Sequence, residues 1–216
     1  YGPRTRVVEI ENTANMGGGR IWPMQTLNAV TDVAKKNGLI VHLDGARLMN
    51  AVVASEISAQ DYAAGSDTAW IDFSKGLGAP VGAALAGSKD FIEEAWRWKQ
   101  RLGGAMRQAG IIAAAGLYSL DHNIPLLAAD NENAKIFAQR IANSTRFAID
   151  PTTVDTNIVI FELANGEDAQ VFCNRLEIEA GVRIGALGPS TFRAVTHLDV
   201  NKKSVVAAAE HLLLMS

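Results

Sequence analysis

Lys75 is the residue of this chain whose surroundings most favour a chemical role. It follows the apolar, strand-like run Thr68 to Phe73 and stands in the glycine-rich turn Ser74-Lys75-Gly76-Leu77-Gly78. Upstream, Asp44 closes a second strand-like run, Leu39 to Leu43. A lysine amine can form a Schiff base with a carbonyl group, and a carboxylate can hold the protonated ring nitrogen of pyridoxal phosphate. The two residues together predict a pyridoxal phosphate site.

The expected strand arrangement explains why Lys75 and Asp44 should lie close together. A predicted helix separates the two strands, so we expect a βαβ unit whose parallel strands share one carboxyl edge. Ligands of open α/β sheets bind at that edge. Arg47 follows Asp44 by about one helical turn, where it can support Asp44 or bind a substrate carboxylate. The spacing alone equally allows Asp44 as a helix N-cap and Lys75 as a loop lysine.

Two further arginines are candidate anion-binding residues. Arg107 follows Gly103-Gly104-Ala105-Met106 at the start of a predicted helix, where free N–H groups favour a phosphate. The alternative for Arg107 is an ordinary surface position. Arg193 stands between Phe192 and Ala194 on a predicted strand, and an inward-facing arginine there needs an anionic partner. A substrate carboxylate or a structural salt bridge would serve equally well.

Composition narrows the class of protein. The 216 residues are 48% hydrophobic and 20% charged, which is typical of a globular chain. A net charge of -3 argues against a general nucleic-acid binder, and no apolar run is long enough to span a membrane. Cys173 is the single cysteine, which excludes an internal disulfide and fits a reducing cytoplasm. The four histidines show no metal-ligand spacing, so we expect no metal site.

The order of the predicted elements sets the expected fold class. Up to residue 145, strand-like runs alternate with helical periodicity, which predicts a mainly parallel sheet with flanking helices. Beyond it, the predicted order of two strands, a helix, two strands and a helix forms a small α+β lobe. We therefore expect an α/β chain in which residues 1–145 belong to a large domain and residues 146–216 form a small C-terminal domain.

Five segments occur in the order and spacing of one enzyme family. They are Glu11-Asn12-Thr13, His42-Leu43-Asp44-Gly45-Ala46-Arg47, Phe73 to Gly82, Gly103 to Gly110, and Arg193 to Val200. Through them the chain closely resembles the low-specificity L-threonine aldolases, in the β-eliminating lyase group of fold-type-I pyridoxal phosphate enzymes. Each segment alone is moderately specific, and their common order across essentially the whole chain makes the resemblance strong.

The resemblance implies a role for each candidate residue. Lys75 is expected to form the Schiff base with pyridoxal 5'-phosphate, and Asp44 to pair with the pyridinium nitrogen. Arg47 is expected at the cofactor and the substrate, holding the substrate carboxylate together with Arg193. Arg107 is expected to reach a phosphate, usually that of a neighbouring subunit, since the family forms dimers or tetramers with sites at the subunit interface.

The chain departs from the family pattern near its N-terminal side. The family normally has a further N-terminal third, which carries backbone contacts to the phosphate and a histidine that stacks on the ring. We expect this missing segment to exist in the natural protein and to complete the site. Tyr1 stands where the family often has a histidine lining the substrate side-chain pocket, and Ala14 replaces the histidine of a Glu-Asn-Thr-His-Asn motif.

The expected activity is cleavage of L-threonine, L-allo-threonine and related β-hydroxy-α-amino acids to glycine and an aldehyde. We expect it from a cytoplasmic homo-oligomer without a nucleic-acid or membrane partner. Two alternatives stay open. One is another reaction of the same fold, such as β-elimination or serine hydroxymethyl transfer. The other is a non-catalytic remnant or split subunit that binds a partner chain.

Overall fold

The computed structural model describes residues 2–164 and 166–215, and the chain forms two compact units of mixed α/β structure. Unit 1 comprises Tyr1–Thr13 and Trp22–Pro125, and unit 2 comprises Ala14–Ile21 and Leu126–Ser216. This division differs from the boundary expected near residue 145. The reason is helix α6 (Leu127–Ile141), which packs against helix α8 (Lys202–Leu214) and strand β6 (Ile158–Leu163) of unit 2.

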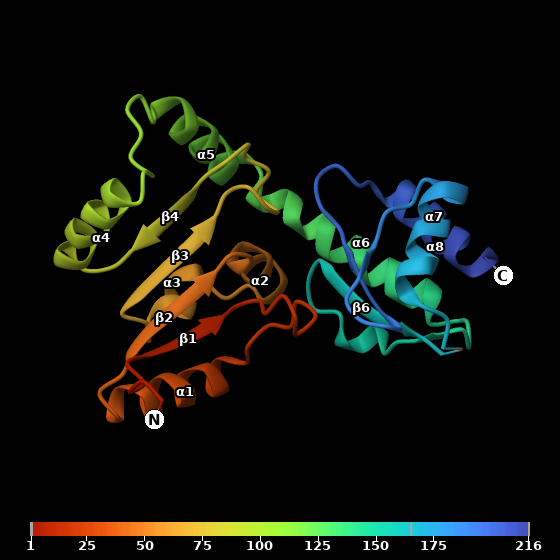
Figure 1. Ribbon diagram of the computed structural model, residues 1–216, viewed down its shortest axis with the longest axis horizontal. Coiled ribbons are helices and arrows are strands. Elements are labelled where there is room, and N and C mark those ends of the chain that lie inside the picture. The colour runs from red at the N-terminus through yellow and green to blue at the C-terminus, as the bar shows by residue number, and fades with distance from the viewer. Residues whose placement is uncertain (1, 165, 216) are drawn as a thin grey trace. The chain divides into compact units, whose positions relative to one another are not determined.

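Unit 1 is built on a four-stranded sheet in the order β1-β2-β3-β4. Its elements are β1 (Val7–Glu11), α1 (Met24–Lys36), β2 (Ile40–Gly45), α2 (Leu48–Ser55), α3 (Ala59–Ala63), β3 (Thr68–Asp72), β4 (Ala83–Ala86), α4 (Lys89–Arg101) and α5 (Gly110–His122). The first three strands are parallel, as the sequence predicts, whereas β4 pairs antiparallel with β3. Figure 1 shows α1 beside β1, and α4 and α5 at the β4 end of the sheet.

One face of this sheet carries the core of unit 1. The strands alternate, so that Ile10, Val41 and Leu43 are buried on the same face. Helix α1 contacts β2 and buries Leu27 and Ala34. Helix α2 also contacts β2. The opposite face carries Glu11, Asp44 and Trp70 at the ends of the parallel strands, and it holds the candidate site.

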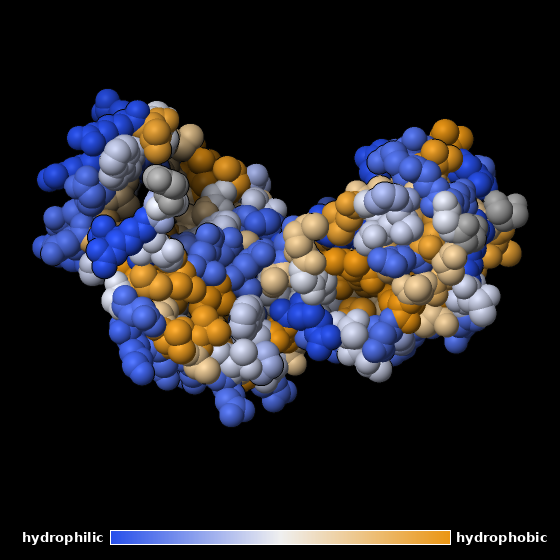
Figure 2. All heavy atoms as spheres, turned by 60° about the horizontal axis from the view of Figure 1, so that its bottom comes forward, coloured by the Kyte–Doolittle hydropathy of each residue, from blue (hydrophilic) through white to orange (hydrophobic). Residues whose placement is uncertain are grey.

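The β4 end of unit 1 leaves large apolar side chains exposed. Ser88 caps α4 by accepting from the Phe91 N–H at 3.2 Å, but α4 buries none of its residues. Trp96 and Trp98 are 54% and 52% exposed, so they are not core residues of this chain. Figure 2 shows hydrophobic residues gathered in orange patches on the part of the surface turned towards the viewer. Exposed apolar side chains of this size are typical of surfaces that another polypeptide covers.

Unit 2 is an antiparallel sheet in the order β5-β6-β8-β7, with helices packed against it. Its elements are η1 (Ile124–Leu126, which begins in unit 1), α6, β5 (Phe147–Ala148), η2 (Pro151–Thr153), β6, α7 (Ala169–Ala180), β7 (Gly185–Ala186), β8 (Thr191–Val195) and α8. The predicted order of two strands, a helix, two strands and a helix is confirmed from β5 to α8. The strand expected at Val182 to Ile184 is wrong, because the pairing with β8 begins at Gly185.

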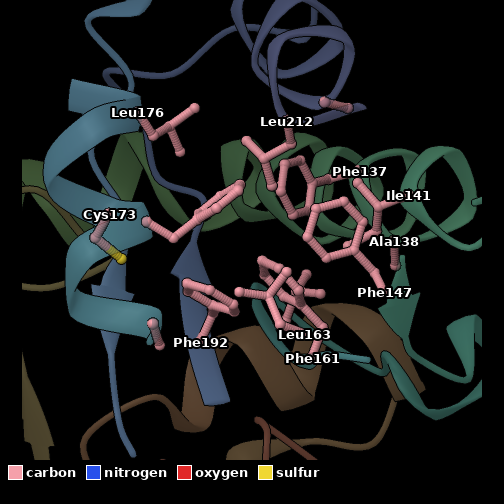
Figure 3. Packing of buried hydrophobic residues seen from close by; sticks show 14 of the residues in the cluster. Phe137, Ala138, Ile141, Phe147, Phe161, Leu163, Cys173, Leu176, Phe192 and Leu212 are labelled. Carbon is pink, nitrogen blue, oxygen red and sulfur yellow. The ribbon is translucent and has the colours of Figure 1, made fainter. Parts of the chain in front are cut away.

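Phenylalanine rings form the centre of the core of unit 2. Phe161 of β6 stacks on Phe192 of β8 with 5.0 Å between ring centroids. Phe137 of α6 and Phe147 of β5 meet Phe161 edge to face, at 5.8 and 5.6 Å. Figure 3 shows these rings pointing towards one another between the helices and the sheet. Burial of several aromatic side chains at such separations is a major source of stability.

The segment Ala14–Ile21 packs on unit 2 although its neighbours on both sides belong to unit 1. Asp155 accepts from Arg20 Nε at 2.8 Å and from the Ile21 N–H at 3.0 Å. Thr156 Oγ1 donates to the Gly19 carbonyl at 2.6 Å. Gly19 has a φ of 69°, and a Cβ there would clash with the Thr156 hydroxyl, so only glycine suits this position.

Asp130, in the first turn of α6, is a buried carboxyl group inside unit 2. Its Oδ2 atom has no hydrogen-bond partner among the described residues, and its backbone oxygen accepts from Thr196 Oγ1 at 2.6 Å. Burial raises the pKa of Asp130 to about 6, although the charge of His197 acts in the opposite direction. A carboxyl group with such a pKa makes the stability of unit 2 depend on pH.

The sign of this dependence follows from the raised pKa of Asp130. The group stabilises the fold below its ordinary pKa of 3.8, and this contribution is lost as the pH rises through about 6. An asparagine does not titrate, so the unfolding free energy of Asp130→Asn should rise relative to that of the unsubstituted protein as the pH goes from 4 to 7, by up to ~3 kcal/mol. Urea unfolding at both pH values measures this gain. Glu132→Gln, at an exposed position of α6, is the control, and equal pH dependence of both variants would contradict the prediction.

No single helix among the described residues is long and apolar enough to cross a membrane, although Gly110–His122 and Ile124–Ile141, which are bent by 53° at their junction, have enough length and apolar character when taken together.

Candidate functional site

The three parallel strands of unit 1 end side by side at the carboxyl edge of the sheet. Glu11 of β1 is in register with Asp44 of β2, and Asp44 is in register with Trp70 of β3. Partners in a parallel pair point to the same face, and His42 Nδ1 lies 2.7 Å from Thr68 Oγ1 on it. The carboxyl edge of β1, β2 and β3 therefore collects acidic and aromatic side chains, as the predicted βαβ unit requires.

Asp44 is held at this edge by the turn that follows β2. Its Oδ1 atom accepts from the Ala46 N–H at 2.9 Å, and its carbonyl accepts from the Asn12 N–H at 2.9 Å. A Cβ at Gly45 would clash with the Trp70 carbonyl, so glycine permits the close approach of β2 to β3. Arg47 is the N-cap residue of α2 and is half-buried, three positions beyond Asp44. The structure thus places Asp44 and Arg47 on one strand–helix turn.

Lys75 lies in the turn directly after β3, where the sequence predicts it. The turn is closed by hydrogen bonds from the Gly78 N–H to the Lys75 carbonyl at 2.9 Å and from the Ala79 N–H to the Phe73 carbonyl at 2.8 Å. Lys75 Nζ pairs with Asp72 Oδ2 at 2.8 Å and lies 5.3 Å from the centroid of the Trp70 ring. Because Trp70 is the register partner of Asp44, Lys75 and Asp44 belong to the same strand edge.

The other predicted residues belong to other elements of the chain. Arg107 is exposed in the turn before α5, which begins at Gly110, so the prediction that Arg107 starts the helix is wrong. Arg193 belongs to unit 2, where it is half-buried on β8 beside Ile160 and Gly185. Its Nε atom is buried without a hydrogen-bond partner in the described part of the chain. Tyr1 lies outside the described residues.

The sequence alone assigns no function to three polar residues at this edge. Asn12 and Thr13 follow β1 and are fully buried, yet Asn12 Nδ2 and Thr13 Oγ1 have no partner among residues 2–164 and 166–215. Asp72, the third, pairs with Lys75. The position of Asp72 three residues before the lysine, at the end of a strand, is a signal that could have identified it.

The residues at the edge fit pyridoxal phosphate. Lys75 supplies the amine, Asp44 supplies a carboxylate, and the unpartnered atoms of Asn12 and Thr13 can hydrogen-bond to a ligand. A buried polar atom without a partner is costly, which favours a bound group that satisfies it. Within the described ranges, no group of three or more His, Cys, Asp or Glu side chains is placed to hold a metal ion.

Comparison with known sequences agrees with the predicted resemblance. The model of the beta-eliminating lyase family matches residues 1–165. The low specificity L-threonine aldolase of Escherichia coli K12 is 36% identical over 208 residues, which are 96% of this chain and 60% of that protein. The low-specificity L-threonine aldolase 1 of Arabidopsis thaliana is 34% identical over 94% of this chain and 57% of its own length. The chain thus spans about 60% of the length of these relatives.

Solved structures share the fold across both units. A putative L-allo-threonine aldolase from Listeria monocytogenes has a TM-score of 0.79 at 25% identity, covering 95% of this chain and 60% of that one. A threonine aldolase from Leishmania major has a TM-score of 0.77 at 20% identity, covering 96% and 60%. The fold-type-I architecture is confirmed by these neighbours. With most of its length matched by the family model, the chain belongs to the beta-eliminating lyase family.

Proposed function

We propose that this chain carries the lysine-containing part of a pyridoxal phosphate-dependent aldolase. The enzyme would cleave L-threonine, L-allo-threonine and related β-hydroxy-α-amino acids to glycine and an aldehyde. The observation that carries the proposal is the placement of Lys75 and Asp44 on one strand edge of unit 1. Family membership supports the lyase chemistry, and the aldolases of Escherichia coli, Arabidopsis thaliana and Listeria monocytogenes support the substrate class.

Lys75 and Asp44 have complementary tasks in this proposal. When bound, pyridoxal phosphate supplies a conjugated ring that accepts the electrons of the Cα–Cβ bond. Lys75 Nζ would hold the cofactor covalently through its amine. The Asp44 carboxylate would keep a proton on the ring nitrogen, because a negative charge favours the protonated form of a neighbouring base.

Arg47 and Arg193 are proposed to bind the substrate carboxylate. A guanidinium group matches a carboxylate with two parallel hydrogen bonds, which fixes the orientation of the amino acid and of its Cα–Cβ bond. The buried Nε atom of Arg193 supports this role, since it lacks a partner in the described part of unit 2. Tyr1 is proposed to line the pocket for the substrate side chain.

The remaining parts of the site are proposed to come from other polypeptide segments. Arg107 is exposed, which fits a contact to the phosphate of a neighbouring subunit. The exposed Trp96 and Trp98 fit a homo-oligomer, either a dimer or a tetramer. A further segment of the same protein, as in the longer relatives, would complete the phosphate contacts. The single Cys173, buried and unpaired, fits a cytoplasmic enzyme.

Product analysis tests this function. Incubated with pyridoxal phosphate and L-threonine, the protein should form glycine and acetaldehyde in equal amounts, and phenylserine should give glycine and benzaldehyde. Release of ammonia and a 2-oxo acid would instead indicate β-elimination. Conversion of serine only with a one-carbon acceptor would indicate hydroxymethyl transfer. Turnover that requires a second, separately encoded chain would indicate a split subunit.

A further inference from the structure

Asp72 holds the amine of Lys75 in place through a network that uses both carboxylate oxygens. Its Oδ2 atom pairs with Lys75 Nζ at 2.8 Å. Its Oδ1 atom accepts from the Ser74 N–H at 2.7 Å and from the Ser74 hydroxyl at 2.6 Å. The Asp72 side chain is only 12% exposed, so this ion pair is less screened by water than a pair on the surface. The carboxylate therefore has a fixed orientation, and it sets the position of Nζ.

The surroundings of Lys75 Nζ favour a positive charge on the nitrogen. The Trp70 ring lies 5.3 Å away on the same face of β3, and its π face attracts a cation. The other titratable residues of β1 and β2 on this face are Glu9, Glu11, His42 and Asp44. Within the described ranges, Asp72 is the only carboxylate in ion-pair contact with Lys75. A negative group and an aromatic ring thus flank one nitrogen.

The titration of Asp72 separates two possible roles for it. Burial acts to raise its pKa, but the hydrogen bonds from Lys75 and Ser74 outweigh burial, so the pKa of Asp72 is lowered below 3.8. A carboxylate with a lowered pKa is a weak base, which makes proton transfer from an ammonium group to Asp72 unfavourable. Asp72 is consequently suited to stabilise a cation beside it and unsuited to remove its proton.

We propose that Asp72 is a positioning residue that acts as the counter-ion of the Lys75 nitrogen, both in the free amine and after Lys75 has condensed with an aldehyde. The second part of the proposal rests on the proposed function. In the condensation, nitrogen forms a double bond to the aldehyde carbon while the carbon–oxygen bond breaks. Two protons of the ammonium group leave with the oxygen as water. The third proton stays on the nitrogen, where the cationic N–H faces the Asp72 carboxylate.

The charge on the condensed nitrogen gives a spectroscopic test. Absorbance spectra of the protein loaded with pyridoxal phosphate are recorded against pH for the unsubstituted protein, Asp72→Asn, Asp72→Glu and Asp90→Asn. In Asp72→Asn the absorbance transition should move to lower pH by about one unit or more, because the cation has lost its counter-ion. Asp72→Glu keeps a carboxylate, so its absorbance transition should lie close to that of the unsubstituted protein. Asp90→Asn, at an exposed position of α4, is the charge-matched control and should behave like the unsubstituted protein.

Chemical labelling of Lys75 tests the free amine without the cofactor. Cofactor-free protein is treated with limiting acetic anhydride at pH 7, and acetylation of Lys75 is followed by mass spectrometry. Acetic anhydride reacts with the neutral amine, because an ammonium group has no free electron pair. The counter-ion stabilises the ammonium form, so its loss in Asp72→Asn should speed the labelling of Lys75 on the order of tenfold relative to Asp90→Asn. If Asp72→Asn does not fold by circular dichroism, Asp72→Ser replaces it in both measurements.

The two measurements separate this proposal from the proposed function. Absence of any Lys75-dependent absorbance in the unsubstituted protein would reject the proposed function, and the labelling rates would then decide the role of Asp72 alone. If absorbance is present, an Asp72→Asn transition at the pH of the control overturns the counter-ion role in the condensed state. Equal labelling rates in Asp72→Asn and Asp90→Asn overturn it for the free amine.

Discussion

Lys75→Ala should abolish both the cofactor absorbance and the cleavage of threonine. The variant loses the lysine amine, paired with Asp72 at the end of β3, that would form the covalent bond to the cofactor aldehyde. We expect the rate of cleavage to fall on the order of 10³-fold or more, because residues that act as one catalytic unit cannot replace each other. The absorbance spectrum and the release of acetaldehyde, measured on the same sample, follow the two effects.

A matched control excludes a general effect of removing a lysine. Lys89→Ala removes an exposed lysine of α4 whose pairing with Glu93 spans 3.8 Å at the surface. It should keep both the absorbance and the activity, since such surface pairs contribute little. An absorbance band that persists in Lys75→Ala would show that another lysine holds the cofactor, and the assignment of Lys75 would be withdrawn.

Phe161→Ala should destabilise unit 2 by about 3–5 kcal/mol, the usual cost of deleting a buried phenylalanine ring. Phe161 is 1% exposed and contacts the rings of Phe137, Phe147 and Phe192, so its removal leaves a cavity and breaks three aromatic contacts. Urea unfolding followed by circular dichroism measures the loss. The four tryptophans all lie in unit 1, so their fluorescence follows that unit separately.

An exposed apolar residue of unit 2 provides the comparison for Phe161. Ile178 on α7 is 84% exposed, and Ile178→Ala should change the unfolding free energy by less than about 0.5 kcal/mol. A loss below about 1 kcal/mol for Phe161→Ala would mean that the surrounding rings close the cavity without cost. Such a result would contradict the packing described for this core.

The parallel strands and the two residues of the strand edge are the features that local sequence predicts best. Buried parallel strands appear in a sequence as short apolar runs. Asp44 and Lys75 come at or just after the ends of such runs. The order of elements in the C-terminal lobe was predictable for the same reason, since alternation and helical periodicity are local signals. The β-branched composition of Val182 to Ile184 predicts a strand there, yet the pairing that forms β7 begins at Gly185.

The structural features that the sequence does not predict depend on contacts between distant residues. Nothing local in Asn12 and Thr13 indicates that their polar atoms are buried without partners, because burial is set by the whole unit. A change in the sequence pattern predicts a boundary near residue 145, whereas the packing of α6 on α8 places that helix in unit 2.

The segment Ala14–Ile21 has a consequence for the order of synthesis on the ribosome. Its hydroxyl partner Thr156 lies 137 positions after Gly19, and Asp155 lies 135 positions after Arg20. The segment therefore emerges from the exit tunnel long before Asp155 and Thr156, and it stays without these partners while Trp22–Pro125 of unit 1 is translated. Unit 2 can complete its structure only when the early-made N-terminal part of the chain is still available to it.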